Sequence, residues 1–273
     1  MKVWILGLIA LVSPLATAAQ GVTEVTIDGS NAEVEIEFVG GISADLEISF
    51  DEVVGLSASA LGLSATTVSP SDLLLLARLP GAGTTIPVGF PVLIEIEPAA
   101  TSPLSFSGTA TVELHTHNLA YTPNSPLRLF KAPLGGDFVD ITAFNGQGSY
   151  RVGGSTGGFS EFMIAADTRP LTEVIDTKFD LLQDSLDFAE CDVPELTTAL
   201  QDSLNAALNS AAGGYYADAA DEIDAFIDLV EAAAGASIPN VWRASRDLTN
   251  SAGELIERAA TLRFSLGLAA SGS

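Results

Sequence analysis

The sequence is poor in cysteine, in histidine and in basic residues. Cys191 is the only cysteine, so no disulfide can form within the chain and side-chain packing must supply its stability. Cys191 is therefore either a small buried hydrophobic residue or the source of an intermolecular disulfide or adduct. Only 11 Lys and Arg accompany 35 Asp and Glu, which gives a formal net charge of −24.

The acidity is shared along the whole chain. Apart from Lys2, five basic and seventeen acidic residues precede Pro170 (−12), and five basic and eighteen acidic residues follow it (−13). Such an even distribution indicates an adaptation to solubility, salt or the surrounding medium rather than one binding patch. Both parts would repel a phosphate backbone, so we expect no nucleic-acid partner.

Long apolar runs are almost absent, and the exception stands at the start. Met1 and Lys2 lead into the apolar run Val3 to Leu15, which ends in Ala16-Thr17-Ala18-Ala19. A positively charged N-terminal region, a short apolar stretch and small residues at the cleavage site are typical of a secretory signal peptide. We predict that residues 1–19 are a leader cleaved at Ala18 and Ala19, and that the product is soluble and either periplasmic or secreted. No later run reaches the length of about eighteen residues that a membrane helix needs, so we do not expect a membrane-embedded protein.

In the first part of the chain, apolar and polar residues alternate. Residues 22–27 and 34–38 alternate on either side of the turn Asp28-Gly29-Ser30-Asn31, which predicts a hairpin with one face in water. The same period recurs at 44–50, 92–97, 109–117, 127–131, 149–152 and 159–165. Glycine and proline signals separate these runs, which is typical of an antiparallel sandwich or an open barrel. We predict a β-sandwich domain over residues 20–168, with one short helix capped by Ser71-Asp72.

After Arg169-Pro170 the apolar spacing becomes three and four. The first stripe lies within residues 175–186, and Asp192 with Glu195 resembles a capping box at the start of a second helix. A third helix is predicted over about 216–234, and a fourth after Pro239 that carries Val241 and Leu248. We predict a four-helix antiparallel bundle over residues 171–270, joined to the β domain by a linker at 169–170.

The third helix resembles part of a known helical module. Its residues Gly214, Ala219, Ile223, Ala225, Phe226, Ile227, Val230 and Gly235 resemble the helical pair of FIMAH-type domains. These domains often end exported bacterial proteins, and their activity is not settled. The order of leader, β domain and helical tail also resembles a bacterial exported family of uncharacterised function. Neither resemblance implies a catalytic residue.

Glu113, His115 and His117 are the clearest candidate metal ligands. Their spacing of two places all three side chains on one face of a strand, while Val112 and Leu114 turn inward. Two imidazoles and a carboxylate are suitable ligands for zinc or copper if a further ligand or water completes the shell. The alternative is a solvated strand face that carries two incidental histidines.

Two further patterns are candidate sites. Phe159-Ser160 resembles the cleavage step of self-cutting ZU- and GAIN-type domains, but Gly158 stands where those domains have the histidine that activates the serine. A second set of residues, the carboxylates of the third helix, suggests calcium, although the chain has no calcium-loop motif. This set is Asp218, Asp221, Glu222, Asp224, Asp228 and Glu231.

The absence of an acid, base and nucleophile constellation favours a non-catalytic protein. We expect an interaction or structural module of the periplasm or extracellular space whose partner is an unknown envelope or extracellular protein. Two alternatives remain open. One is a metal-assisted hydrolase or metal-binding protein that uses Glu113, His115 and His117, and the other is a small-ligand carrier that uses the inside of the β domain.

Overall fold

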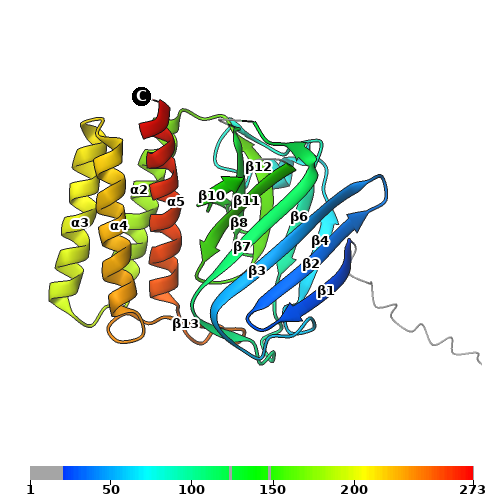
Figure 1. Ribbon diagram of the computed structural model, residues 1–273, viewed down its shortest axis with the longest axis horizontal. Coiled ribbons are helices and arrows are strands. Elements are labelled where there is room, and N and C mark those ends of the chain that lie inside the picture. Colours follow the sequence, from blue (N-terminus) through cyan, green and yellow to red (C-terminus); the bar gives the residue numbers. More distant parts are fainter. Residues whose placement is uncertain (1–20, 123–124, 147–148, 273) are drawn as a thin grey trace, which may run out of the picture.

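A computed structural model describes residues 21–122, 125–146 and 149–272. In these residues, thirteen strands form two antiparallel sheets. Twelve strands precede the long helices in the chain, and the last strand lies between the third and fourth long helices. Figure 1 shows the sheets stacked on one side of the molecule and the helices standing along the other. None of the helices in the described residues is both long and apolar enough to cross a membrane.

Sheet A presents one face to the core and one to solvent. Its strand order is β1-β2-β3-β7-β11-β10, and β13 pairs with one end of β7. In β2, Ala32, Val34 and Ile36 are buried while Glu33 and Glu35 are exposed, as the period of two predicts. The strands are β1 (Val22–Asp28), β2 (Asn31–Phe38), β3 (Ile42–Val54), β7 (Ser105–Ala120), β10 (Phe144–Gly146), β11 (Ser149–Thr156) and β13 (Val241–Arg243).

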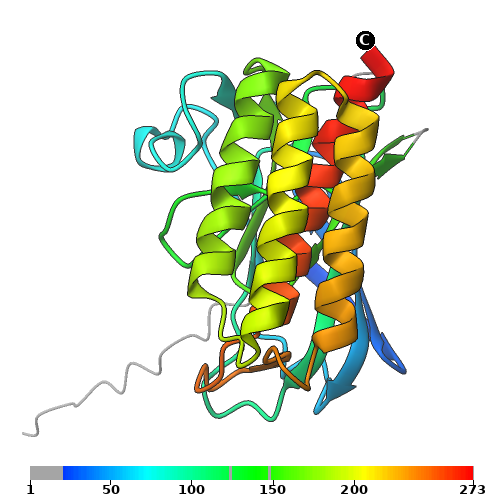
Figure 2. The same cartoon turned by 90° about the vertical axis from the view of Figure 1, so that its left-hand side faces the viewer.

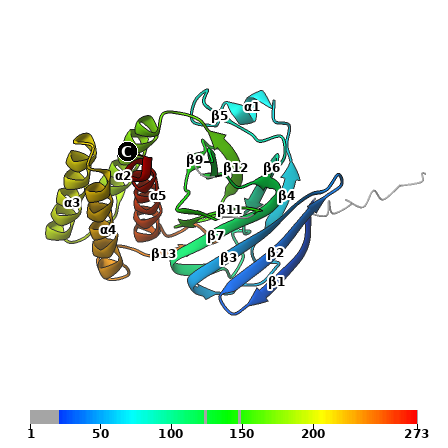
Figure 3. The ribbon, with the colours of Figure 1, turned by 45° about the horizontal axis from the view of Figure 1, so that its top comes forward.

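Sheet B is covered on both faces. Its order is β4-β6-β12-β8-β9, with β5 paired to β12. Phe162 and Ile164 of β12 enter the core shared with sheet A, whereas Met163 and Ala165 belong to a separate apolar cluster with Leu75 of α1 (Leu73–Leu76) and with the segment that follows it. Figure 3 shows α1 on the side of sheet B that faces away from sheet A. The strands are β4 (Leu63–Thr67), β5 (Thr84–Thr85), β6 (Val92–Ile96), β8 (Leu127–Ala132), β9 (Val139–Asp140) and β12 (Glu161–Asp167). The short α1 is capped as predicted, because Asp72 Oδ1 accepts from the amides of Leu74 and Leu75 at 2.9 and 3.3 Å.

Four long helices share a second apolar core. They are α2 (Leu171–Phe188), α3 (Pro194–Ala212), α4 (Tyr216–Ala233) and α5 (Ser251–Gly272). Figure 2 shows them side by side, and Figure 1 places α2 and α5 next to the sheets with α3 and α4 outside them. Leu182, Leu204, Phe226 and Leu262 are among the residues that fill this core.

Helix α5 is buried on two sides. Leu255 and Leu262 face the helical core, while Gly253 and Glu257 face sheet A, where α5 contacts β7 and β11. Gly157 makes this approach possible, because a Cβ added there would lie 2.6 Å from the backbone nitrogen of Glu254. The helices therefore lie directly against the sheets.

Two local predictions in the helical part are wrong. Val241 is not helical: it begins β13, and α5 starts only at Ser251, because the Trp242 ring stacks on Phe106 at a centroid distance of 5.3 Å and holds this segment on sheet A. Asp192 does not cap α3 either. Val193 occupies that position and makes no side-chain cap bond, while Pro194 begins the helix with a φ that suits its first turn.

Candidate functional site

The outer face of β7 carries the predicted histidine cluster. Val112 and Leu114 are fully buried, whereas Glu113 and His115 are half-buried and His117 is exposed. The imidazole rings of His115 and His117 lie 5.0 Å apart between centroids. The three side chains therefore share the outer face of one strand, as their spacing predicts.

Other protein groups already occupy this cluster. Arg151 Nη1 donates to Glu113 Oε1 at 2.5 Å. His115 Nε2 lies 2.5 Å from Ser149 Oγ, and His115 Nδ1 lies 3.3 Å from Asp45 Oδ2. Within the described ranges, no group of three or more His, Cys, Asp or Glu side chains is placed to hold a metal ion. The zinc site stays a prediction, which equilibrium dialysis against a His115→Ala, His117→Ala variant would test.

The cluster borders a larger set of carboxylates, which we call the acidic sheet face. It crosses four adjacent strands and surrounds a shallow depression of about 230 Å³, whose edge also includes Thr26, His115 and Arg151. The acidic sheet face consists of Glu24 on β1, Glu33 and Glu35 on β2, Asp45 and Glu47 on β3, and Glu113 on β7.

The strand register sets these carboxylates against one another. Glu33 lies opposite Glu47, Glu35 opposite Asp45, and Glu47 in turn opposite Glu113. Like charges that face each other across neighbouring strands destabilise a sheet. Among the described residues, Arg151 is the only lysine or arginine that lines the depression. Six of the 35 acidic residues therefore gather on this face.

The predicted self-cleavage residues lie just before β12. Phe159 is a core residue, 2% exposed, with its ring 5.5 Å from that of Phe106 and 5.4 Å from that of Trp242 between centroids. Ser160 is 3% exposed, and its Oγ has no hydrogen-bond partner among the described residues. No described residue is thus positioned to deprotonate Ser160. Self-cleavage stays a prediction, and an intact-mass measurement would test it.

The remaining predicted site residues are the leader cleavage residues, the calcium carboxylates and Cys191. Ala18 and Ala19 lie outside the described residues. The carboxylates proposed for calcium are spread along α4, and one of them, Asp224, forms an ion pair with Arg263 of α5. The lone Cys191 is a free, partly buried thiol beside the helical core.

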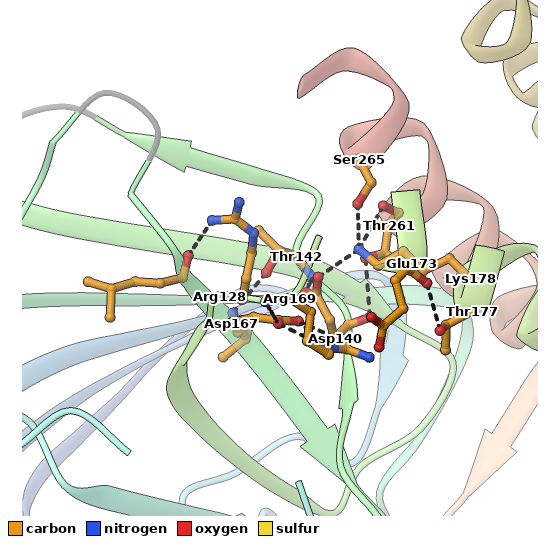
Figure 4. Close-up of polar contacts among 12 residues, drawn as sticks. Arg128, Asp140, Thr142, Asp167, Arg169, Glu173, Thr177, Lys178, Thr261 and Ser265 are labelled. Carbon is orange, nitrogen blue, oxygen red and sulfur yellow. Dashed lines mark hydrogen bonds and ion pairs between the residues drawn. The ribbon is translucent and has the colours of Figure 1, made fainter. Parts of the chain in front are cut away.

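A buried ion pair that the sequence analysis missed joins α2 to sheet B. Lys178 Nζ lies 2.7 Å from Asp140 Oδ2 and donates to Thr261 Oγ1 at 2.7 Å and to Ser265 Oγ at 2.8 Å (Figure 4). Both side chains of the pair are 3% exposed. Burial lowers the pKa of Lys178 below its usual value, although the Asp140 carboxylate opposes that shift. The available signal was a lysine set among the apolar residues Ile175, Phe179 and Leu182.

A second buried ion pair joins α5 to both sheets. Lys131 Nζ of β8 lies 2.6 Å from Glu257 Oε2, which also accepts from Thr156 Oγ1 at 3.0 Å and from the Gly157 amide at 3.2 Å. Burial alone would raise the pKa of Glu257, but Lys131, Arg258 and the hydrogen bonds outweigh it, so that pKa lies below its usual value. The two ion pairs connect α2 and α5 to the sheets.

One family model covers almost the whole chain. The model, described as a family of unknown function (DUF6689), matches residues 6–270. The chain belongs to this family. The DUF6689 match spans both sheets and the four long helices α2 to α5. No curated protein matches the chain.

Proposed function

We propose that this DUF6689 chain is an exported, non-catalytic binding protein whose acidic sheet face contacts a basic partner outside the cytoplasm. Export rests on the leader pattern of residues 1–19, with its small-residue exit at Ala18 and Ala19. The location is the periplasm or the extracellular space, and the partner is an envelope or extracellular protein.

The observation that carries the proposal is the set of opposed carboxylates on β1, β2, β3 and β7. Glu33 and Glu47 face each other with no basic residue between them, and Glu35 and Asp45 do the same. This repulsion destabilises the sheet when no partner is bound, and a partner with positive charges would relieve it. The face also projects a negative field that speeds the encounter with a basic surface.

The chemistry of the partner follows from the spacing of the carboxylates. Neighbouring strands lie about 4.8 Å apart, so the rows of carboxylates form a closely spaced grid. A lysine- or arginine-rich segment matches such a grid. A non-catalytic role is supported by the partnered nitrogens of His115 and by the Ser160 hydroxyl, which has no base beside it in the part of the chain that the structure describes.

We also propose that the long helices form an antiparallel four-helix bundle related to FIMAH-type domains. Ile223, Phe226 and Val230, which carry part of the resemblance, are fully buried in the helical core. In this proposal residues 171–270 form a helical domain that supports the β domain of residues 20–168, and the link at 169–170 falls between Asp167 of β12 and Leu171 of α2.

Titration calorimetry with an octalysine peptide tests the binding face. In a Glu33→Gln, Glu35→Gln, Glu47→Gln variant we expect affinity to fall by about tenfold or more, which is about 1.4 kcal/mol. Binding of the unchanged chain should weaken as salt is raised to about 0.15 M, where the screening length is about 8 Å.

The matched control removes the same charge from another exposed surface. Asp218, Asp221 and Asp228 on α4 are exposed, and an Asp218→Asn, Asp221→Asn, Asp228→Asn variant changes net charge equally. We expect this control to bind within about twofold of the unchanged chain. Equal losses in the two variants would mean that net charge, and not the sheet face, determines binding.

A further inference from the structure

A pocket of about 310 Å³ opens where the end of β12 meets α2 and α5. We call it the arginine pocket. It lies next to the Lys178–Asp140 pair, and Figure 4 shows Arg128, Asp167, Arg169 and Ser265 in this region. Its lining includes Arg128, Asp167, Arg169, Leu171, Val174 and Leu268.

The charged part of the pocket is cationic. Two guanidinium groups and one carboxylate line it, in a chain whose net charge is −24. The nearby Lys178 and Asp140 neutralise each other as a pair. The two guanidinium groups and one carboxylate leave the lining with one net positive charge, and Glu173, whose charge also acts on Arg169, lies outside the lining.

Protein contacts hold both guanidinium groups in place. Arg128 Nη1 donates to the backbone oxygens of Ser125 and Leu127 at 2.6 and 2.7 Å. The Arg128 guanidinium also lies beside the Tyr150 hydroxyl and 5.5 Å from the centre of the Phe264 ring.

Arg169 is held by a neighbouring carboxylate. Its Nε and Nη2 donate to Asp167 at 3.0 and 2.7 Å, which leaves Nη1 without a hydrogen-bond partner among the described residues. Because Arg128 and Arg169 are fixed before a ligand arrives, little conformational entropy remains to be lost when they bind one.

The other wall of the pocket is apolar. Leu171 and Leu268 are half-buried, and Val174 is 7% exposed. Val174 belongs to none of the three apolar cores found in the described residues. An apolar wall beside fixed cations suits a ligand that has an anionic head and an apolar tail.

We propose that the arginine pocket binds a small organic monocarboxylate, with its head group on Arg128 and Arg169 and its tail against Leu171, Val174 and Leu268. Arg169 would donate from Nη1, which Asp167 leaves free, and Arg128 from the nitrogens that do not bond Ser125 and Leu127. The carboxylate therefore receives charge-assisted hydrogen bonds from two guanidinium groups. Asp167 adds a negative charge that disfavours dianions such as phosphate. This site is separate from the acidic sheet face and does not depend on the function proposed for that face.

Calorimetry of the full chain with octanoate tests the proposal. We expect saturable binding of octanoate, with octan-1-ol and inorganic phosphate each at least about tenfold weaker. Octan-1-ol lacks the charge, and phosphate lacks the tail. Equal binding of octan-1-ol would overturn the role of the arginines, equal binding of phosphate would overturn the role of the apolar wall, and no saturable octanoate binding would overturn the site.

Three variants locate the binding. Arg128→Gln should weaken octanoate binding by about tenfold, since a charge-assisted hydrogen bond is lost, and Leu268→Trp should abolish it by filling the pocket. Arg263→Gln removes a half-exposed arginine of α5, the helix that carries Leu268, and should leave the affinity for octanoate within about twofold. Thermal melting checks that each variant is folded, and Arg128→Lys replaces Arg128→Gln if the latter does not fold. Unchanged binding in folded Leu268→Trp would place octanoate elsewhere and contradict the proposal.

Discussion

Replacing Lys178 by methionine is expected to lower the free energy of unfolding by about 3–5 kcal/mol. The Lys178 and Asp140 side chains are both 3% exposed, so the substitution leaves a carboxylate buried without its cation. It also removes the donor to Thr261 and Ser265, whose hydroxyl oxygens lie 2.7 and 2.8 Å from Lys178 Nζ. Urea denaturation followed by circular dichroism measures the change.

Two further variants separate the ion pair from general damage. A Lys178→Met, Asp140→Asn double variant removes both charges and keeps an acceptor for the Thr142 amide, which lies 2.8 Å from Asp140 Oδ1. We expect it to recover most of the loss. Breaking the pair of Arg243 and Asp247, which are 50% and 53% exposed, should cost far less than Lys178→Met. A loss below about 1 kcal/mol in Lys178→Met would show that the pair does not hold α2 to sheet B.

Replacing Glu257 by glutamine is expected to cost about 3 kcal/mol at neutral pH and much less in acid. In the folded chain the pKa of Glu257 lies below its usual value of 4.5, which the unfolded chain retains. The unfolded chain therefore binds the proton first as pH falls. The stabilisation is complete above the unfolded pKa and is lost as pH falls below about 4.5 towards the folded pKa.

Denaturation curves between about pH 7 and pH 3 measure this difference. The unchanged chain and the Glu257→Gln variant should differ most at pH 7 and converge as the pH falls below about 4.5. The control is Glu231→Gln on α4, an exposed carboxylate, which we expect to change stability by less than about 0.5 kcal/mol at each pH. A difference that stays constant across this range would contradict the role assigned to the Glu257 carboxylate.

The regular elements could be predicted because their causes are local. The alternation of Ala32, Val34 and Ile36 with glutamates predicts β2 and its solvent-exposed face. The turn at Gly29 determines the pairing of β1 with β2. The apolar spacing of Ile175, Phe179 and Leu182 likewise predicts α2. Each of these patterns is contained within one element.

The errors arise where a distant residue decides the structure. Val241 fits a helical spacing with Leu248, but Phe106 and Phe159 hold the neighbouring Trp242 against sheet A instead. Lys178 lies on the apolar stripe of α2, but that Asp140 of β9 is the partner of its charge depends on how the helix packs on sheet B. Contacts between parts far apart in the sequence cannot be read from local periodicity.

The acidic sheet face shows the same limit. Glu33 and Glu35 could be assigned to a wet strand face from alternation alone. That Glu47 and Glu113 complete the set depends on the order and register of β2, β3 and β7. The sequence therefore indicates acidic strands but not one acidic surface.

Carbodiimide crosslinking tests the binding face most directly, because this reagent joins carboxylates to lysines that touch them. After incubation with the octalysine peptide, we expect mass spectrometry to find the crosslinks concentrated on Glu33, Glu35 and Glu47. Exposed helix carboxylates such as Asp221 and Asp228 should carry few of them. Crosslinks distributed over sheet and helix carboxylates in proportion to their exposure would contradict a dedicated binding face.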